Sequence, residues 1–185
     1  MVRRWVVNDL DLVVDLVNTV YALADPPDRL TTVDHFRVIL RGAGQSDLAE
    51  ELADGDLDRL RELREQLRPA FGCDTGSEAT DLVNELLREH AVVPQLSQDT
   101  TGVIRMDASG MSHGLAALAG RLVAALAEHL VQHGIRRLGV CAAAPCECVF
   151  VDRTRPGTRK YCCDTCNDRA AAAAHYRRRK ANRRD

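Results

Sequence analysis

Two short cysteine-rich stretches of this 185-residue chain decide how its fold is interpreted: CAAAPC at 141–146 and CCDTC at 162–166. The outer cysteines are spaced Cys-x4-Cys in the first stretch and Cys-x3-Cys in the second, with fifteen residues between the pairs. In a reducing compartment, such a cluster holds a metal ion more often than it forms disulfides. Four thiolates on two turns match a closed tetrahedral zinc site. The sequence therefore predicts one structural zinc ion, with the ligands Cys141, Cys146, Cys162 and Cys166.

Two further cysteines leave alternatives open. Cys148 and Cys163 each lie beside a predicted ligand, and Cys163 forms a tighter Cys-x2-Cys pair with Cys166. We prefer Cys162 because we expect it to end a strand opposite the first pair, and Cys163 is the alternative ligand. A thiol redox sensor that uses Cys148 and Cys163 is a competing interpretation, as are cysteines that serve only as small buried side chains.

The segment between the two pairs is expected to form a β-hairpin. Residues 149–151 (Val-Phe-Val) have the composition of a strand, residues 154–158 contain a Pro-Gly turn, and residues 160–161 are the predicted return strand. A helix is expected to begin near Asp164. Zinc would join this helix to the hairpin, and residues 136–185 have too few apolar side chains to fold without it.

Charge divides the chain into two parts. Residues 136–185 carry 13 basic and 5 acidic side chains, whereas residues 1–135 carry 12 basic and 22 acidic ones. Such asymmetry is typical of a protein that contacts nucleic acid through its basic part. We therefore expect a helical domain at 1–135 that receives a signal or dimerises, and a zinc-dependent domain at 136–185 that binds DNA.

Arginine dominates the basic part. A guanidinium group binds phosphate in a bidentate manner and can read guanine in the major groove. Double-stranded DNA is preferred to RNA, because this part lacks the exposed aromatic side chains on which single-strand readers stack bases. The predicted DNA-contacting residues are Arg153, Arg155, Arg159, Lys160, Arg169, Arg177, Arg178, Arg179, Lys180 and Arg183.

Residues 1–135 show the apolar periodicity of a helical bundle. The predicted helices cover residues 9–21, 33–40, 46–53, 56–71, 77–90 and 112–132, with a small hairpin at 92–98 and 103–107. The fold class is therefore mainly α: a helical bundle with a small β-hairpin, followed by a zinc-stapled β-hairpin and a basic helix. The most apolar stretch, 115–130, is interrupted by Glu128 and is too short to cross a membrane, so no membrane partner is expected.

Asn18 and Thr19 are polar residues within the predicted first helix. One interpretation is that they line a ligand pocket. The other is that Thr19 bends the helix while Asn18 bonds to the backbone. The sequence contains no phosphate-binding loop, nucleophile elbow or pair of catalytic carboxylates, so we do not expect an enzyme. Acidic residues at positions 9, 11 and 15 would interrupt the apolar core of a secretion signal, which favours the cytoplasm.

The cysteine pairs and their surroundings resemble the CGNR zinc finger. The matching residues are the run at 141–152, Arg-Lys-Tyr-Cys at 159–162, and Cys-Asn-Asp-Arg at 166–169, which takes the place of the family's Cys-Gly-Asn-Arg signature. The N-terminal part resembles the ABATE domain ascribed to stress-induced bacterial transcription regulators, with DLVNTV at 15–20 in place of its Leu-x-x-x-Asn-Thr segment.

This resemblance implies a zinc-dependent bacterial transcription regulator. Its expected partner is double-stranded DNA, and a homodimer and an unidentified small-molecule or protein effector are compatible with the same interpretation. A different class of function also fits: a zinc-stabilised interaction module that binds an acidic protein, including the acidic part of a second copy.

Overall fold

The computed structural model describes residues 9–93, 95–98, 101–107 and 113–181, and these are mainly helical. The α-helices are α1 (Asp9–Val17), α2 (Val33–Gly42), α3 (Ser46–Glu51), α4 (Leu57–Leu67), α5 (Gly76–Glu89), α6 (Gly114–His133) and α7 (Asp164–Ala181). The short 3-10 helices are η1 (Asp54–Asp56), η2 (Arg68–Phe71) and η3 (Ile135–Arg137). The strands are β1 (Gln95–Gln98), β2 (Ile104–Asp107), β3 (Leu138–Val140) and β4 (Val149–Val151). The predicted fold class is confirmed.

Helix α6 lies at the centre of the bundle. It packs against α1, α3, α4 and α5, and its Leu118, Leu122 and Leu126 are completely buried. By length and composition α6 could cross a membrane, with a mean hydropathy of 1.5 over its most apolar window, but 50% of that window is buried inside the protein. Its apolar face therefore forms part of the core.

Helix α1 ends earlier than the sequence pattern predicts. The predicted helix continued to residue 21, but α1 ends at Val17. There the Thr19 hydroxyl donates a hydrogen bond of 2.7 Å to the Leu16 carbonyl, and the chain then enters a β-bridge between Val20 and Asp28. The predicted helix is thus wrong for residues 18–21, because a β-bridge to a later segment replaces the helical hydrogen bonds.

The loop that follows α1 is held onto α4 by a buried arginine. Arg64, only 5% exposed, donates bonds of 2.8 and 2.9 Å to the two carboxylate oxygens of Asp28 and one of 3.1 Å to the Thr19 hydroxyl. These bonds join the two ends of the loop to one helix.

The start of α5 also differs from its prediction. The predicted helix begins at residue 77, but α5 begins at Gly76, and the Thr75 hydroxyl caps it by accepting a bond of 3.2 Å from the Glu78 amide. The predicted small hairpin is present as β1 and β2, which pair antiparallel with Gln98 opposite Ile104.

In the hairpin near the cysteines, strand β4 pairs with a different segment from the predicted one. β4 pairs antiparallel with β3, which precedes the first cysteine pair. Residues 160–161, the predicted partner, form no strand. They are joined to the first cysteine stretch by a backbone bond, in which the Ala142 amide donates to the Lys160 carbonyl. Gly139 on β3 faces Phe150 on β4, and a Cβ atom at this position would lie 2.7 Å from the phenyl ring. Glycine therefore allows the two short strands to pair, and β3 is a strand that the sequence pattern does not predict.

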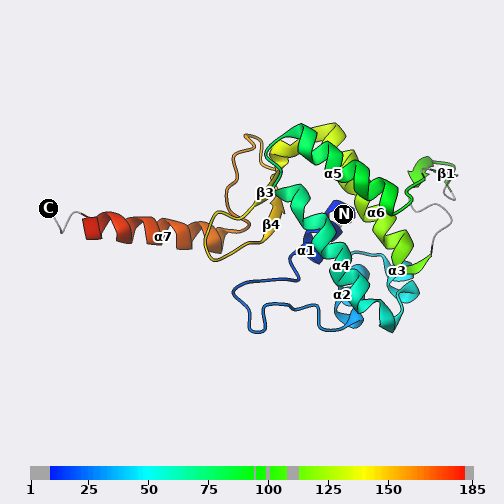
Figure 1. The fold of residues 1–185 in the computed structure, drawn as a ribbon, viewed down its shortest axis with the longest axis horizontal. Coiled ribbons are helices and arrows are strands. Elements are labelled where there is room, and N and C mark those ends of the chain that lie inside the picture. The colour runs from blue at the N-terminus through cyan, green and yellow to red at the C-terminus, as the bar shows by residue number, and fades with distance from the viewer. Residues whose placement is uncertain (1–8, 94, 99–100, 108–112, 182–185) are drawn as a thin grey trace.

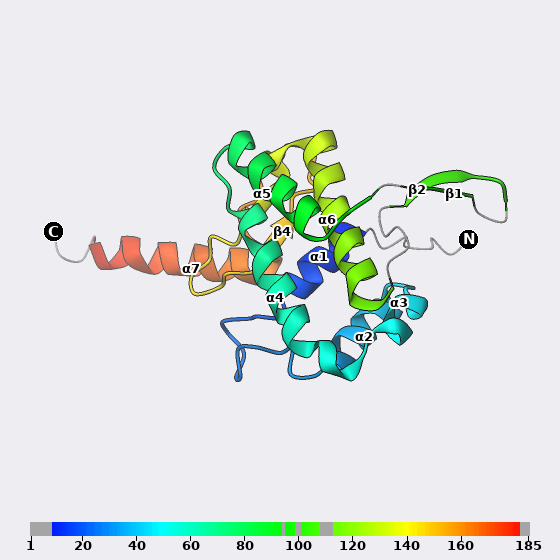
Figure 2. The ribbon, with the colours of Figure 1, turned by 45° about the vertical axis from the view of Figure 1, so that its right-hand side comes forward.

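The β3–β4 hairpin is packed into the helical bundle. Leu138, Val149 and Val151 belong to the same cluster of buried residues as α1 and α6. The Asn18 amide also pairs with β4: Nδ2 donates to the Val149 carbonyl at 3.0 Å, and Oδ1 accepts from the Val149 amide at 2.8 Å. The interpretation that Asn18 bonds to the backbone is confirmed. Helix α7 extends away from the bundle on one side of the molecule, and the β1–β2 hairpin projects on the opposite side (Figure 1; Figure 2).

Asn18→Ala is expected to lower the free energy of unfolding by about 2–3 kcal/mol, because both backbone groups of Val149 lose their partner in a buried position. Urea unfolding of the zinc-loaded protein measures this change. Asn84→Ala, at an exposed position of α5, is the control, and we expect it to cost less than about 0.5 kcal/mol. Equal losses in the two variants would contradict a structural role of Asn18.

Candidate metal centre

The first cysteine pair is carried by the loop between β3 and β4. The Cys141 amide donates to the Cys148 carbonyl at 2.9 Å, which continues the strand pairing into the loop. The Cys146 amide donates to the Ala143 carbonyl at 2.9 Å and closes a tight turn. Together these bonds turn the two ligand side chains toward the same point.

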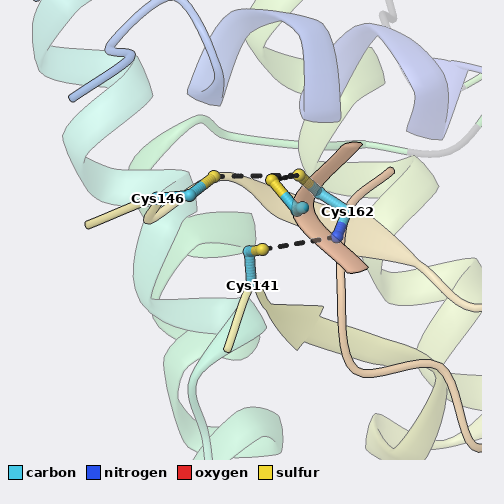
Figure 3. A group of neighbouring side chains, drawn as sticks. Cys141, Cys146 and Cys162 are labelled. Atoms are coloured by element: carbon cyan, nitrogen blue, oxygen red, sulfur yellow. Dashed lines mark hydrogen bonds between the residues drawn. The ribbon is translucent and has the colours of Figure 1, made fainter. Parts of the chain in front are cut away.

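The second pair lies at the start of α7. Cys162 precedes the helix and Cys166 is in its first turn, so a spacing of four residues brings their sulfur atoms to 3.6 Å. Cys162 Sγ also lies 3.7 Å from Cys146 Sγ. Figure 3 shows Cys141, Cys146 and Cys162 directed toward one another.

The four predicted sulfur atoms, those of Cys141, Cys146, Cys162 and Cys166, all lie within 4.8 Å of one another. A tetrahedral zinc ion with Zn–S bonds of about 2.3 Å requires its ligand sulfurs to be about 3.8 Å apart. The two shortest separations, 3.6 and 3.7 Å, match that geometry. The predicted ligands thus fit one zinc ion, and four sulfurs leave no open coordination position for catalysis.

The neighbouring cysteines lie outside this group. Cys163 is exposed, and its sulfur is 3.9 Å from that of Cys162. Cys148 is buried, but its sulfur is not among the four that all lie within 4.8 Å of one another. The geometry therefore selects Cys162 over Cys163, although Cys162 lies on a loop rather than at the end of a strand.

Arg169 is part of the metal centre. Its Nη2 atom donates to the Ala143 carbonyl at 2.9 Å and lies 3.4 Å from Cys166 Sγ. The Cys162 amide is also 3.4 Å from Cys141 Sγ. Four thiolates outweigh the charge of one zinc ion, and these donors offset the excess negative charge. Arg169 is one of the predicted DNA-contacting residues, but its guanidinium group binds the Ala143 carbonyl and lies against Cys166.

Asp152 and Arg159 shape the loop that leads to Cys162. Burial raises the pKa of Asp152, but bonds from the Thr154 hydroxyl (2.6 Å) and amide and from the Arg159 amide (2.8 Å) bring it below its usual value. The Arg159 guanidinium donates to the Tyr161 carbonyl at 2.8 Å and to the Cys162 carbonyl, and lies 5.2 Å from the Phe150 ring centre. Asp152 is absent from the predicted site residues, although it is the last residue of the run at 141–152 that resembles the CGNR finger.

Comparison with known families agrees with this site. The model for ABATE, "Putative stress-induced transcription regulator", matches residues 10–133, and the model for the CGNR zinc finger matches residues 137–179. The chain belongs to the ABATE family. This ABATE protein carries a CGNR finger whose four cysteines are arranged for one structural metal ion, as the resemblance implied. No curated protein is significantly similar to it.

The other predicted DNA-contacting residues of this ABATE protein lie at two places. Arg153, which pairs with Asp11 at 2.5 Å, and the exposed Arg155 and Lys160 lie on the loop before Cys162. The exposed residues near the end of α7 are Arg177, Arg178, Arg179 and Lys180. Arg183 lies outside the described residues.

Asn18 and Thr19 of this ABATE protein line a hollow of about 540 Å³ between α1 and α2. Asp15, Arg29 and His35 also line it. The polar atoms of Asn18 and Thr19 already have protein partners: the Val149 backbone, the Leu16 carbonyl and the Arg64 guanidinium. The two residues thus line a pocket while their polar groups hold the fold together.

Proposed function

We propose that this ABATE protein is a zinc-dependent transcription regulator that binds double-stranded DNA through α7, while its N-terminal helices receive a signal or dimerise. The observation that carries this proposal is the position of α7: an exposed, basic helix that extends from the metal centre away from the bundle (Figure 1; Figure 2). The family description supports a regulatory role.

The dimensions of α7 suit the major groove. Its 18 residues span about 27 Å at 1.5 Å per residue. The groove is about 12 Å wide and admits an α-helix. Beyond Ala170 every described side chain of α7 is exposed except the half-buried Ala174, so little protein obstructs the approach of a duplex.

Charge supports the same orientation. Four consecutive cations, at residues 177–180, stand at the far end of the helix, while residues 1–135 are strongly acidic. Phosphates would attract the helix end and repel the bundle, which orients the protein on DNA. Lys160 adds a cation near the base of α7.

A salt titration tests this proposal. We expect the affinity of the zinc-loaded protein for duplex DNA, measured by fluorescence anisotropy, to fall steeply with salt. Each phosphate contact contributes about 0.9 to the slope of log K against log salt concentration, so replacing three contacting arginines is expected to reduce the slope by about 2–3. The variant combines Arg177→Gln, Arg178→Gln and Arg179→Gln.

The matched control removes the same charge from the bundle: Arg41→Gln, Arg59→Gln and Arg88→Gln, all at exposed positions. We expect this variant to keep the full slope. Affinity that does not depend on salt would contradict the proposal. Self-association in the absence of DNA that the α7 variant abolishes would favour the rival function, in which the finger binds an acidic protein.

A further inference from the structure

A cavity of about 410 Å³ lies at the junction between the helical bundle and the finger. Its walls come from the first residues of α1, the end of α6, η3, the end of β4 and the loop after β4. The lining residues are Leu10, His129, His133, Arg137, Val151, Asp152, Arg153, Thr154 and Arg155. The cavity therefore contacts both segments that the family models match.

One wall of the cavity contains a buried polar atom without a partner. His129 is 7% exposed, and among the described residues its Nε2 atom has no hydrogen-bond partner. Buried polar groups in proteins are almost always paired, so an isolated imidazole nitrogen beside a cavity points to a bound ligand. Burial, and then the charges of His133, Arg153 and Arg137, lower the pKa of His129 to about 4. His129 is therefore neutral near pH 7 and can donate one hydrogen bond through Nε2.

The charged groups around the cavity favour an anion. Arg137 is fixed by bonds to the carbonyls of Thr154 (2.5 Å) and Asp152 (3.4 Å). Both carboxylate oxygens of Asp152 are occupied by Thr154 and the Arg159 amide.

Two more arginines face the same space. Arg153 pairs with Asp11, whereas Arg155 has neither a hydrogen-bond nor an ion-pair partner within the described part of the chain. Three guanidinium groups, those of Arg137, Arg153 and Arg155, thus line the cavity. The two carboxylates beside them, Asp11 and Asp152, already have partners, so net positive charge remains for a ligand.

We propose that this cavity binds a small oxyanion, a free molecule that carries a phosphate or carboxylate group, and that Arg155 and His129 are two of its contacts. The volume lies within the range of about 300–1,000 Å³ typical of small-ligand sites. A phosphate of duplex DNA offers the same chemistry. However, it is fixed on the surface of a rod and cannot readily reach an imidazole that is only 7% exposed. The site would give the proposed regulator a signal input, and its binding can be measured whether or not α7 binds DNA.

Thermal unfolding of the zinc-loaded full chain with inorganic phosphate, at constant ionic strength set by chloride, tests the site. At a tenfold excess over Kd, phosphate is expected to raise the Tm of the wild type by about 3 °C or more. Arg155→Gln is expected to abolish the shift, and it should fold normally because the side chain is exposed. His129→Leu is a second variant. Arg41→Gln, an exposed arginine on α2, is the matched control and should retain the full shift.

Two results would overturn the proposal. The first is a phosphate shift that is absent in the wild type or the same in all four proteins. The second is competition with DNA. If saturating duplex DNA abolishes the Tm shift caused by phosphate, and Arg155→Gln also weakens DNA binding, the cavity belongs to the DNA interface. A shift that persists with DNA present, or in a protein that binds no DNA, supports a site for a free oxyanion.

Discussion

Replacing Cys162 with serine is expected to remove the metal and to release α7 from the bundle. Cys162 Sγ lies 3.7 Å from Cys146 Sγ and 3.6 Å from Cys166 Sγ, so its loss breaks the link between the two cysteine pairs. Structural zinc in small modules contributes about 10–16 kcal/mol of binding free energy that is also folding free energy. We expect zinc content to fall from about one ion per chain to nearly none.

Metal analysis and limited trypsin digestion measure this change. Without zinc, the exposed loop at 153–160 and the arginines of α7 are expected to be cleaved at much lower protease concentrations. The bundle should survive, because Leu138 and Val149 are buried in its core rather than around the sulfurs. Cys163→Ser is the control, since this exposed residue lies outside the sulfur group. Zinc loss in the control, or a full zinc equivalent in Cys162→Ser, would refute the ligand assignment.

The second large effect is expected at the pair formed by Asp28 and Arg64. Asp28→Ala should lower the free energy of unfolding by about 3 kcal/mol, because it leaves the Arg64 charge buried without its bidentate partner. The value is at the low end for a buried pair because the Asp28 side chain is 37% exposed. Asp58→Ala, which removes a carboxylate that is 86% exposed from a pair with Arg61, is the control and should cost less than about 1 kcal/mol.

The pH dependence of this pair has a definite sign. The hydrogen bond from Arg64 lowers the pKa of Asp28, so the contribution of the carboxylate is complete above the usual aspartate pKa of about 3.9. It is lost as pH falls through the lower value of the folded state. Denaturant unfolding should show a constant difference between wild type and Asp28→Ala above about pH 5 and a shrinking difference below about pH 4. A difference that grows with acid would show that Asp28 is not held as an ion.

The sequence predicts those features that depend on local patterns. Apolar periodicity identifies the helices, and cysteine spacing identifies the four sulfurs that meet. The ends of elements are less well predicted where a tertiary contact competes, as at Thr19, which leaves the helix to join a bridge and to bond with Arg64.

Contacts between distant residues could not be predicted from local patterns. Asn18 pairs with Val149 across 131 positions, and nothing in either neighbourhood identifies the other. β3 contains Gly139 and closely follows the end of a helix, so its sequence does not resemble a strand. The reason for the glycine is visible only in the structure, where the Phe150 ring occupies the space that a side chain at position 139 would need. Arg169 lies in a basic helix, and its spacing cannot show that its guanidinium group turns back to Ala143.

Among the described residues, helix α7 is held in place near its first turn, where Cys166 and Arg169 meet the metal centre. A helix of 18 residues mounted in this way acts as a lever: a rotation of about 10° at its base would move its tip by about 5 Å, more than a base-pair step. The stiffness of the bonds from the four cysteine sulfurs to the metal would therefore determine how precisely the arginines at the far end of α7 are positioned. Any change at the base that tilts α7 by a few degrees would be magnified at its tip.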